Sequence, residues 1–295
     1  MASWKTWLNA TRPKTLPASL SPVLIGTSIA FYHNSFNLFY FLLISILAVL
    51  IQISTNFINE LYDFKKGADT GNRLGPTRAV AAGLIDYKSM KYVSTALILV
   101  IFALGMILVW KSGWIILAIG LSSLFFAWAY TGGPYPLAYN GWAEPAVLIF
   151  FGIFAVNGTY FVFTDKFDYI PLITSLMPGL LSTNLLLVNN IRDIETDRTV
   201  NKNTLAVKLG RNYSNHLYLI IHFFTLLVPF YLAQYLNNYL LLLPLILLLL
   251  HIKCAKNIYF LNGHELNKVL FMNGLLILLN GILTALAFFL LKQYG

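Results

Sequence analysis

Asparagine and aspartate recur at helical spacing in two short stretches of this sequence. In the first stretch, Asn56, Asn59 and Asp63 follow the pattern i, i+3, i+7, and Asp69 comes shortly after Gly67. Residues at this spacing share one face of an α-helix, and the glycine would end or loosen the helix before Asp69. The pattern therefore predicts three polar side chains on one helical face and a fourth in the loop that follows.

The second stretch repeats this arrangement later in the chain. Asn189, Asp193 and Asp197 follow the pattern i, i+4, i+8, which again predicts one helical face, and Asn190 lies at the neighbouring angle. Each stretch reads asparagine, then aspartate, then a further aspartate, then a basic loop. This order hints at an internal repeat, although the similarity is confined to the polar positions.

Carboxylates beside several cations are typical of a metal site that binds a phosphorylated ligand. Mg²⁺ prefers oxygen ligands and commonly binds one or two carboxylates together with substrate phosphates. The two predicted faces could hold one or two Mg²⁺ ions that bridge to a diphosphate, and the asparagines offer carbonyl ligands and amide donors. Basic side chains could bind the remaining phosphate oxygens. The candidates are Lys65, Lys66, Arg73, Arg78, Arg192, Arg198 and Lys202.

Simpler explanations account for part of this pattern. Basic loops follow from the positive-inside rule of membrane proteins, and single acidic residues at a membrane edge often only solvate the end of a helix. Neither explanation accounts for aspartates that share a helical face with asparagine in two separate stretches. The acidic residues therefore carry more of the prediction than any single cation.

The segments around both stretches are apolar enough to lie in a membrane. Hydrophobic residues make up 58% of the 295 residues and charged residues only 11%, whereas soluble domains carry about 25% charged residues. Runs of roughly twenty apolar residues recur along the chain without the alternation that a β-barrel needs. We predict one all-α, polytopic membrane domain over residues 1–295. Its nine spans cover about 16–33, 37–64, 90–110, 113–131, 143–164, 168–192, 214–236, 239–260 and 269–291.

The basic residues predict how these spans are oriented. If the N-terminus is cytoplasmic, the inner segments contain all of the 20 Lys and Arg residues except Lys111, Lys166 and Lys292. This asymmetry predicts an integral protein of the cytoplasmic membrane, with both polar stretches on the cytoplasmic side and the C-terminus outside. It also explains most of the net charge of +9 without a nucleic-acid partner.

A third polar segment lies on the same predicted side of the membrane. The connection "AYTGGPYPLAYNGWAE" is rich in glycine and proline, which predicts a turn-rich cover over the end of the bundle. Tyr130, Tyr135 and Tyr139 could donate to phosphate or face a cation, and Glu144 could position a cation or a hydroxyl group. The alternative is a tight interfacial turn within an aromatic belt.

The two polar stretches resemble the signatures of the UbiA family of intramembrane prenyltransferases. The first reads "NELYDFKKGAD", in which Glu60 replaces the usual aspartate and two extra residues separate Asp63 from Asp69; the second reads "DIETD". The resemblance covers essentially the whole chain and implies prenyl transfer from a polyprenyl diphosphate that enters from the lipid bilayer. It also implies that Mg²⁺ is held by Asp63, Asp69, Asp193 and Asp197. The implied substrate-binding residues are Asn56, Asn59, Lys66, Arg73, Arg78, Tyr130, Tyr139, Asn189, Asn190, Arg192, Arg198 and Lys202.

Three segments resemble the branch of that family that acts on 1,4-dihydroxy-2-naphthoate. They read "DFKKGADTGNRLGPTRAVAAG", "YTGGPYPLAYNGWAE" and "NNIRDIETDRTVNKNTLAVKLG". The resemblance implies that this ring is prenylated with loss of CO₂ to give demethylmenaquinone.

Two alternatives stay open. Another aromatic acceptor, such as 4-hydroxybenzoate, would use the same diphosphate site. An ion-coupled membrane transporter could also use paired acids in two repeats. Against the transporter, the acids are predicted at the ends of the spans, and the basic residues beside them suit an anionic ligand.

Overall fold

The computed structural model describes residues 2–68, 74–75 and 77–294, and these residues form helices joined by short turns. Asp69 and Arg73, two of the predicted site residues, lie outside the described residues. The elements that match the nine predicted spans are α2 (Pro17–Tyr32), α3 (Leu38–Lys65), α4 (Tyr87–Ser112), α5 (Trp114–Ala129), α7–η2–α8 (Ala143–Leu148, Ile149–Phe154 and Ala155–Thr164), α9–α10 (Tyr169–Thr174 and Leu176–Arg192), α12 (Leu205–Tyr235), η3–α13 (Tyr239–Leu247 and Leu248–Phe260) and α14 (Leu266–Tyr294).

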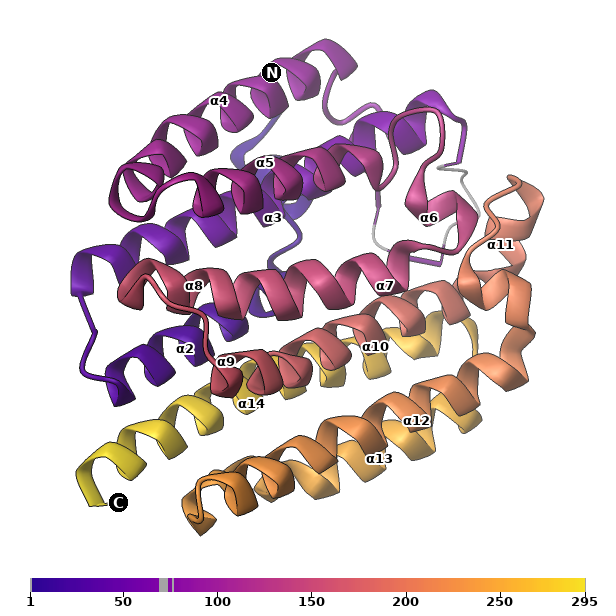
Figure 1. Cartoon of the computed structure of the whole chain (residues 1–295). Helices are drawn as coiled ribbons and strands as arrows, with labels where there is room; N and C mark the ends of the chain where they lie inside the picture. Colours follow the sequence, from indigo (N-terminus) through magenta and orange to yellow (C-terminus); the bar gives the residue numbers. More distant parts are fainter. Residues whose placement is uncertain (1, 69–73, 76, 295) are drawn as a thin grey trace.

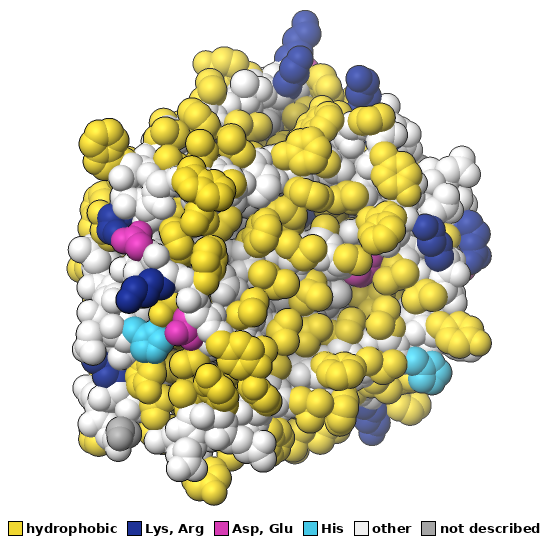
Figure 2. Space-filling model, in the orientation of Figure 1, with side chains coloured by type: hydrophobic (Ala, Val, Ile, Leu, Met, Phe, Trp, Pro, Cys, Tyr) yellow, Lys and Arg dark blue, Asp and Glu magenta, His cyan; other side chains and the backbone are white. Residues whose placement is uncertain are grey.

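The all-helical membrane architecture is confirmed. Seven of these elements are long and apolar enough to cross a bilayer, while α2 and α5 are shorter apolar helices. Large apolar side chains are exposed along them, and Trp110, at 94% exposure, is the clearest case. Hydrophobic side chains cover most of the face shown in Figure 2, while charged side chains gather toward its edges. A surface of this kind is stable only when lipid covers it.

Short polar residues set where several helices begin. The side chain of Asn37 accepts a hydrogen bond from the amide of Tyr40 at the start of α3, and Asp86 accepts from the amide of Ser89 at the start of α4. Such caps satisfy amides that have no partner within the helix. The caps and turn residues thus mark helix ends within a sequence that is otherwise continuously apolar.

Glycines let the central helices approach closely. A Cβ atom at Gly281 of α14 would come within 2.4 Å of Ser21 Oγ on α2, and one at Gly152 of η2 would lie 2.8 Å from Gly179 Cα on α10. Without a hydrophobic driving force between helices in lipid, small residues permit the close contacts that hold a bundle together. These contacts pack α14 closely against α2 and η2 closely against α10.

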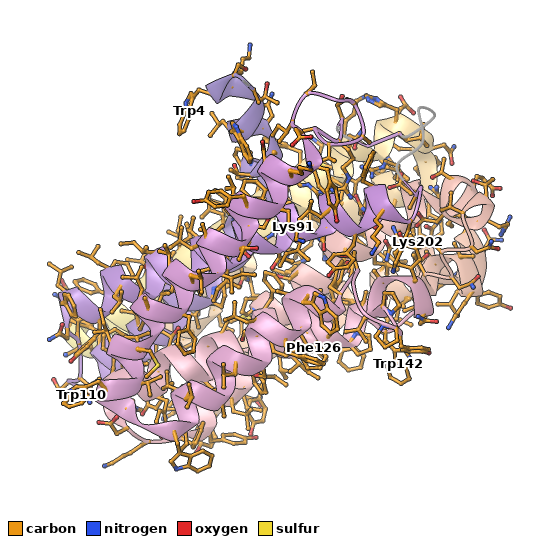
Figure 3. The ribbon with its side chains drawn as sticks, turned by 90° about the horizontal axis from the view of Figure 1, so that it is seen from above. Trp4, Lys91, Trp110, Phe126, Trp142 and Lys202 are labelled. Atoms are coloured by element: carbon orange, nitrogen blue, oxygen red, sulfur yellow. The ribbon has the colours of Figure 1, made fainter. Side chains whose placement is uncertain are left out.

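The short elements gather at the ends of the bundle. In Figure 1, α6 (Leu137–Asn140) and α11 (Ile194–Thr199) lie at the right-hand end, and the C-terminus lies at the left-hand end. Figure 3 likewise separates Trp110 at one end from Trp142 and Lys202 at the other. The loops that contain the predicted site residues therefore meet at one end of the molecule.

Candidate active site

A cavity of about 940 Å³ runs between the helices from this end into the apolar region. Its inner wall is formed by apolar side chains of α3, α4, α5 and η2. Phe102, Met106 and Leu121 line the cavity and are also 45%, 41% and 48% exposed, so its apolar part lies beside lipid. The sequence-predicted site residues that line it are Asn56, Asn59, Asp63, Arg78, Tyr130, Asn189, Asn190, Arg192 and Lys202. The cavity thus joins a charged end to an apolar interior.

Asp63 lies near the C-terminal end of α3 and is 4% exposed. Its Oδ2 atom accepts a hydrogen bond of 3.0 Å from Arg78 Nη2, and its Oδ1 atom accepts one of 2.9 Å from the Tyr139 hydroxyl. Charge-assisted hydrogen bonds of this length hold a buried carboxylate in a fixed orientation. Asp63 is therefore a positioned carboxylate at the cavity wall.

Tyr139 connects the two polar stretches. Its ring centroid lies 4.2 Å from Lys66 Nζ and 5.8 Å from Lys202 Nζ, within the range of cation–π attraction, and its hydroxyl donates to Asp63. Lys202 Nζ in turn lies 3.2 Å from Asp197 Oδ1. Tyr139 therefore contacts residues of both polar stretches.

Lys66 lies just beyond α3 and is not among the residues that line the cavity, although its contacts are with residues around it. Its Nζ atom donates to the carbonyl oxygen of Thr131 at 2.7 Å, and the hydroxyl of Thr131 donates to Asn59 Oδ1 at 3.0 Å. Burial lowers the pKa of Lys66, and the Asp63 carboxylate partly opposes this shift. The cation is therefore tied to the connection between α5 and α6 and stays beside Asp63.

Arg192 and Asp193 form a buried pair where α10 ends. Arg192 Nε donates to Asp193 Oδ1 at 2.7 Å and its Nη2 to Oδ2 at 2.6 Å. The other contacts of the guanidinium are Nη2 to Asn189 Oδ1 at 2.8 Å and Nη1 to Asn267 Oδ1 at 2.7 Å. Arg192 lines the cavity, but its guanidinium nitrogens already donate hydrogen bonds to Asp193, Asn189 and Asn267.

Arg198 is directed away from this group. Its side chain is 57% exposed, it pairs with Glu195 Oε2 at 3.3 Å, and it is not among the residues that line the cavity. Asp197, by contrast, is 7% exposed, and its carboxylate faces Lys202. The Lys202 amide donates a hydrogen bond to the Asp197 carbonyl oxygen, which closes the turn between the two residues. Of these basic residues in and after α11, the structure brings only Lys202 to the cavity.

Asn190 links α10 to the first turn of α7. Its Nδ2 atom donates to Glu144 Oε1 at 2.8 Å, and Glu144 is 3% exposed. Tyr130 lines the cavity nearby. Burial raises the pKa of the Tyr130 hydroxyl, and the carboxylates of Glu144 and Asp63 raise it further. The phenol therefore remains a hydrogen-bond donor at neutral pH.

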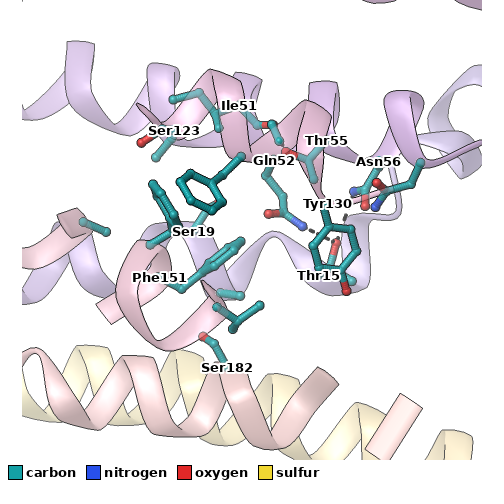
Figure 4. A pocket seen from close by; sticks show the side chains of 18 of the residues that line it. Thr15, Ser19, Ile51, Gln52, Thr55, Asn56, Ser123, Tyr130, Phe151 and Ser182 are labelled. Carbon is teal, nitrogen blue, oxygen red and sulfur yellow. Dashed lines mark hydrogen bonds between the residues drawn. The ribbon is translucent and has the colours of Figure 1, made fainter. Parts of the chain in front are cut away.

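Polar residues that the sequence analysis did not select also line the cavity. Gln52 lies one helical turn before Asn56, and both amides donate to Thr15 Oγ1, at 3.2 and 3.4 Å (Figure 4). Gln52 continues the face of Asn56, Asn59 and Asp63 at i, i+4, i+7 and i+11, so its spacing was a usable signal. Arg12, in the N-terminal segment, lines the cavity as well.

Glu60, on a neighbouring face of α3, accepts a hydrogen bond of 3.1 Å from the amide of Val80 and is 1% exposed. This contact anchors the backbone that immediately follows Arg78. Glu60, which replaces aspartate in the first signature, therefore holds the segment that contains Arg78, the ion-pair partner of Asp63.

Within the described ranges, no three His, Cys, Asp or Glu side chains are close enough to form a metal site on their own. Contacts through Tyr139 and Lys202 connect Asp63 to Asp197, and asparagine side chains from both stretches line the cavity. Mg²⁺ needs only one or two carboxylates when substrate phosphates supply further oxygens. The donors present fit a metal that binds together with a diphosphate.

Comparison with known proteins agrees with this architecture. The sequence profile of the UbiA prenyltransferase family matches residues 19–289. The 1,4-dihydroxy-2-naphthoate octaprenyltransferase of Haemophilus influenzae is 34% identical over 214 residues, 70% of each chain, and that of Mycobacterium leprae is 35% identical over 218 residues, 74% of each chain.

Solved structures show the same fold at low sequence identity. A UbiA homolog from Archaeoglobus fulgidus, solved with DMAPP and Mg²⁺, superposes with a TM-score of 0.70 at 13% identity and covers 98% of this chain and 100% of its own. The same homolog with GPP and Mg²⁺ gives a TM-score of 0.69 at 14% identity, with 96% of this chain and 99% of its own covered. With two polar stretches meeting at one cavity and a family profile matched over nearly its whole length, this chain belongs to the UbiA prenyltransferase family.

Proposed function

We propose that this protein transfers a polyprenyl group from a polyprenyl diphosphate to 1,4-dihydroxy-2-naphthoate, with loss of the ring carboxylate as CO₂, to give demethylmenaquinone, formed as its quinol. The main support is that one cavity joins a cationic, carboxylate-bearing end to a long apolar wall. A polyprenyl diphosphate has the same two parts. The similarity to two octaprenyltransferases that act on this naphthoate supports the choice of acceptor.

The charged end would hold the diphosphate and its metal. Asp63, Asp193 and Asp197, with Asp69 from outside the described residues, would be the carboxylates available to Mg²⁺. When bound, Mg²⁺ neutralises negative charge on the leaving diphosphate. Lys66, Arg78 and Lys202 would supply further positive charge to the phosphate oxygens. The same role for Arg73, which lies outside the described residues, stays a prediction.

The remaining polar residues would position these groups. Asn59 holds Lys66 through Thr131, whose hydroxyl donates to Asn59 and whose carbonyl accepts from Lys66. Tyr139 holds Asp63 by a direct hydrogen bond. Asn189 and Arg192 would orient Asp193, and Asn56, Tyr130 and Asn190 would face the ligand from the cavity wall. Because Arg198 pairs with exposed Glu195, its predicted role at the phosphate would require the side chain to leave that contact.

The apolar wall would protect the reacting carbon from water. Phe150 and Phe154 come from the π-helical turn η2, and the ring centroid of Phe150 lies 4.5 Å from that of Phe126 on α5 and 5.1 Å from that of Phe154. All three line the cavity. Aromatic faces attract a cation and exclude water, as the developing charge on an allylic carbon requires.

Purified protein in nanodiscs, supplied with octaprenyl diphosphate and 1,4-dihydroxy-2-naphthoate, is expected to release prenylated naphthoquinol in the presence of Mg²⁺. EDTA should reduce turnover to background, and added Mg²⁺ should restore it. Product would be followed by mass spectrometry. Product with 4-hydroxybenzoate alone would preserve the diphosphate site and contradict the acceptor. If folded protein gives no product with any acceptor, the enzymatic proposal is contradicted. Ion transport would then be the hypothesis to test.

We further propose that residues 1–295 form one membrane domain with the N-terminus, α6 and α11 on the cytoplasmic side and the C-terminus outside. The distribution of basic residues supports this orientation. In intact cells, a membrane-impermeant maleimide should label Lys166→Cys but should label Glu195→Cys only after permeabilisation. Both positions are exposed, and native Cys254 is buried. Labelling of both variants in intact cells would contradict the proposed orientation.

A further inference from the structure

The N-terminal segment brings a cation to the cavity through an unusual turn. Between α1 (Trp4–Ala10) and the short η1 helix (Pro13–Thr15), Arg12 has φ 52° and ψ 67°, in the left-handed region. This conformation is unfavourable for a residue with a side chain, and Pro13 restricts the backbone of Arg12 further. Strained residues of this kind persist only where surrounding contacts hold them, and they cluster at functional sites.

Contacts from α3 hold this turn on both sides of Arg12. Asn56 Nδ2 donates to the carbonyl of Thr11 at 3.0 Å, and Gln52 Nε2 donates to Thr15 Oγ1 at 3.2 Å. The hydroxyl and the amide of Thr15 both donate to the carbonyl oxygen of Arg12, each at 2.9 Å. Figure 4 shows Gln52, Asn56 and Thr15 meeting at the cavity wall. Two buried amides of α3 thus fix the backbone from which Arg12 projects.

The turn occupies a different level of the cavity from the charged end. Arg12 and Thr15 line the cavity together with Gln52, Asn56 and Tyr130. Asn56 precedes Asp63 by seven residues on one face of α3, which places the two side chains about 10 Å apart along the helix. Burial raises the pKa of the Tyr130 hydroxyl, and the Arg12 guanidinium partly opposes this rise. Arg12 therefore adds a positively charged side chain to the cavity lining.

We propose that Arg12 is a specificity-determining residue that binds the carboxylate of the aromatic acceptor while the diphosphate occupies the level of Asp63. This inference rests on the proposed function, because it takes the acceptor to be an aromatic carboxylate. A guanidinium matches a carboxylate with two parallel hydrogen bonds, and neutral donors at the same level, Gln52 and the Tyr130 hydroxyl, suit the hydroxyl groups of the ring.

The decisive measurement compares two ligands that differ only in the carboxylate. Binding of 1,4-dihydroxy-2-naphthoate and of 1,4-dihydroxynaphthalene to the full-length protein in nanodiscs would be measured anaerobically by titration calorimetry. In Arg12→Asn, affinity for the naphthoate is expected to fall roughly 10- to 100-fold, because one charged hydrogen-bonding partner is lost. Affinity for 1,4-dihydroxynaphthalene and for geranyl diphosphate with Mg²⁺ should be unchanged. Arg12→Lys should recover part of the loss, since the charge returns without the planar fork.

The variants are chosen to keep the segment folded. Asparagine tolerates the left-handed backbone of position 12 better than other residues with side chains, so Arg12→Asn should unfold at the temperature of the parent. Lys5→Asn is the matched control, because it removes the same charge from an exposed position of the same segment that does not line the cavity. It should leave all three affinities unchanged.

Other outcomes would overturn the inference. Equal weakening of both naphthalene ligands in Arg12→Asn would make the residue a general part of the wall. Selective loss of geranyl diphosphate binding would assign Arg12 to the donor. If the parent converts the naphthoate but Arg12→Asn keeps its preference for the carboxylate, this inference alone fails. If the parent neither binds nor converts the naphthoate, the proposed function fails and this inference fails with it.

Discussion

Asp63→Asn is expected to reduce prenyl transfer on the order of 10²- to 10³-fold while the protein remains inserted and folded. The substitution preserves the shape of the side chain but removes the negative charge that Arg78 and the Tyr139 hydroxyl hold at the cavity wall. Losing one preorganised electrostatic group at a reaction centre has effects of this size. The rate would be measured at saturating Mg²⁺ and substrates, and insertion would be checked by detergent extraction and size-exclusion chromatography.

A matched substitution separates lost chemistry from general damage. Asp86→Asn also converts an aspartate to asparagine, but Asp86 caps the start of α4 and asparagine caps helices equally well. Its rate should equal that of the parent. Near-parental turnover of Asp63→Asn would remove Asp63 from the metal and diphosphate site, and a comparable loss in Asp86→Asn would show that the assay responds to structure alone.

Arg192→Gln is expected to lower the free energy of unfolding by about 3–5 kcal/mol in protein freed of metal with EDTA. The guanidinium is buried and contacts Asp193 twice as well as Asn189 and Asn267. Removing one member of a buried ion pair leaves the other charge without compensation, which costs this much in other proteins. Thermal unfolding in detergent would show the loss as a lower midpoint.

The double variant Arg192→Gln with Asp193→Asn tests the cause. Because it removes both charges, it should unfold at a higher temperature than Arg192→Gln alone, giving a coupling that a double-mutant cycle measures. If Arg192 instead serves mainly as a phosphate ligand, Arg192→Gln would unfold like the parent, and the affinity for geranyl diphosphate would fall.

The architecture and the location of the site were accessible from sequence because membrane proteins separate residue types strongly. Eight of the nine predicted spans agree with the observed elements within three residues, since continuous apolar runs leave few alternatives to helices in lipid. The start predicted at residue 214 was wrong, because α12 begins nine residues earlier, at Leu205. Asn56, Asn59 and Asp63 share a face at the cavity because their spacing follows the helical period.

The partners of long side chains were not accessible in the same way. Arg192 and Arg198 lie six residues apart in one basic stretch, yet one is buried against Asn267 of α14 and the other pairs with exposed Glu195. That difference depends on which helix packs beside each residue, and local sequence does not encode it. Arg12 was counted only among the basic residues of the predicted cytoplasmic segments, because its place in the cavity depends on contacts with α3 more than 40 residues away.

The change from a charged end to a lipid-flanked apolar wall has a kinetic consequence. A donor with a polyprenyl tail is confined to the bilayer, so its availability is set by its mole fraction among the lipids. An acceptor with a carboxylate and two hydroxyls partitions toward water, so its availability is set by its aqueous concentration. Inert lipid added to the membrane dilutes the first and leaves the second almost unchanged. The rate of an enzyme with this cavity therefore depends on two independent concentrations, that of the donor in the membrane and that of the acceptor in water. Growth of the membrane lowers the rate only by diluting the donor.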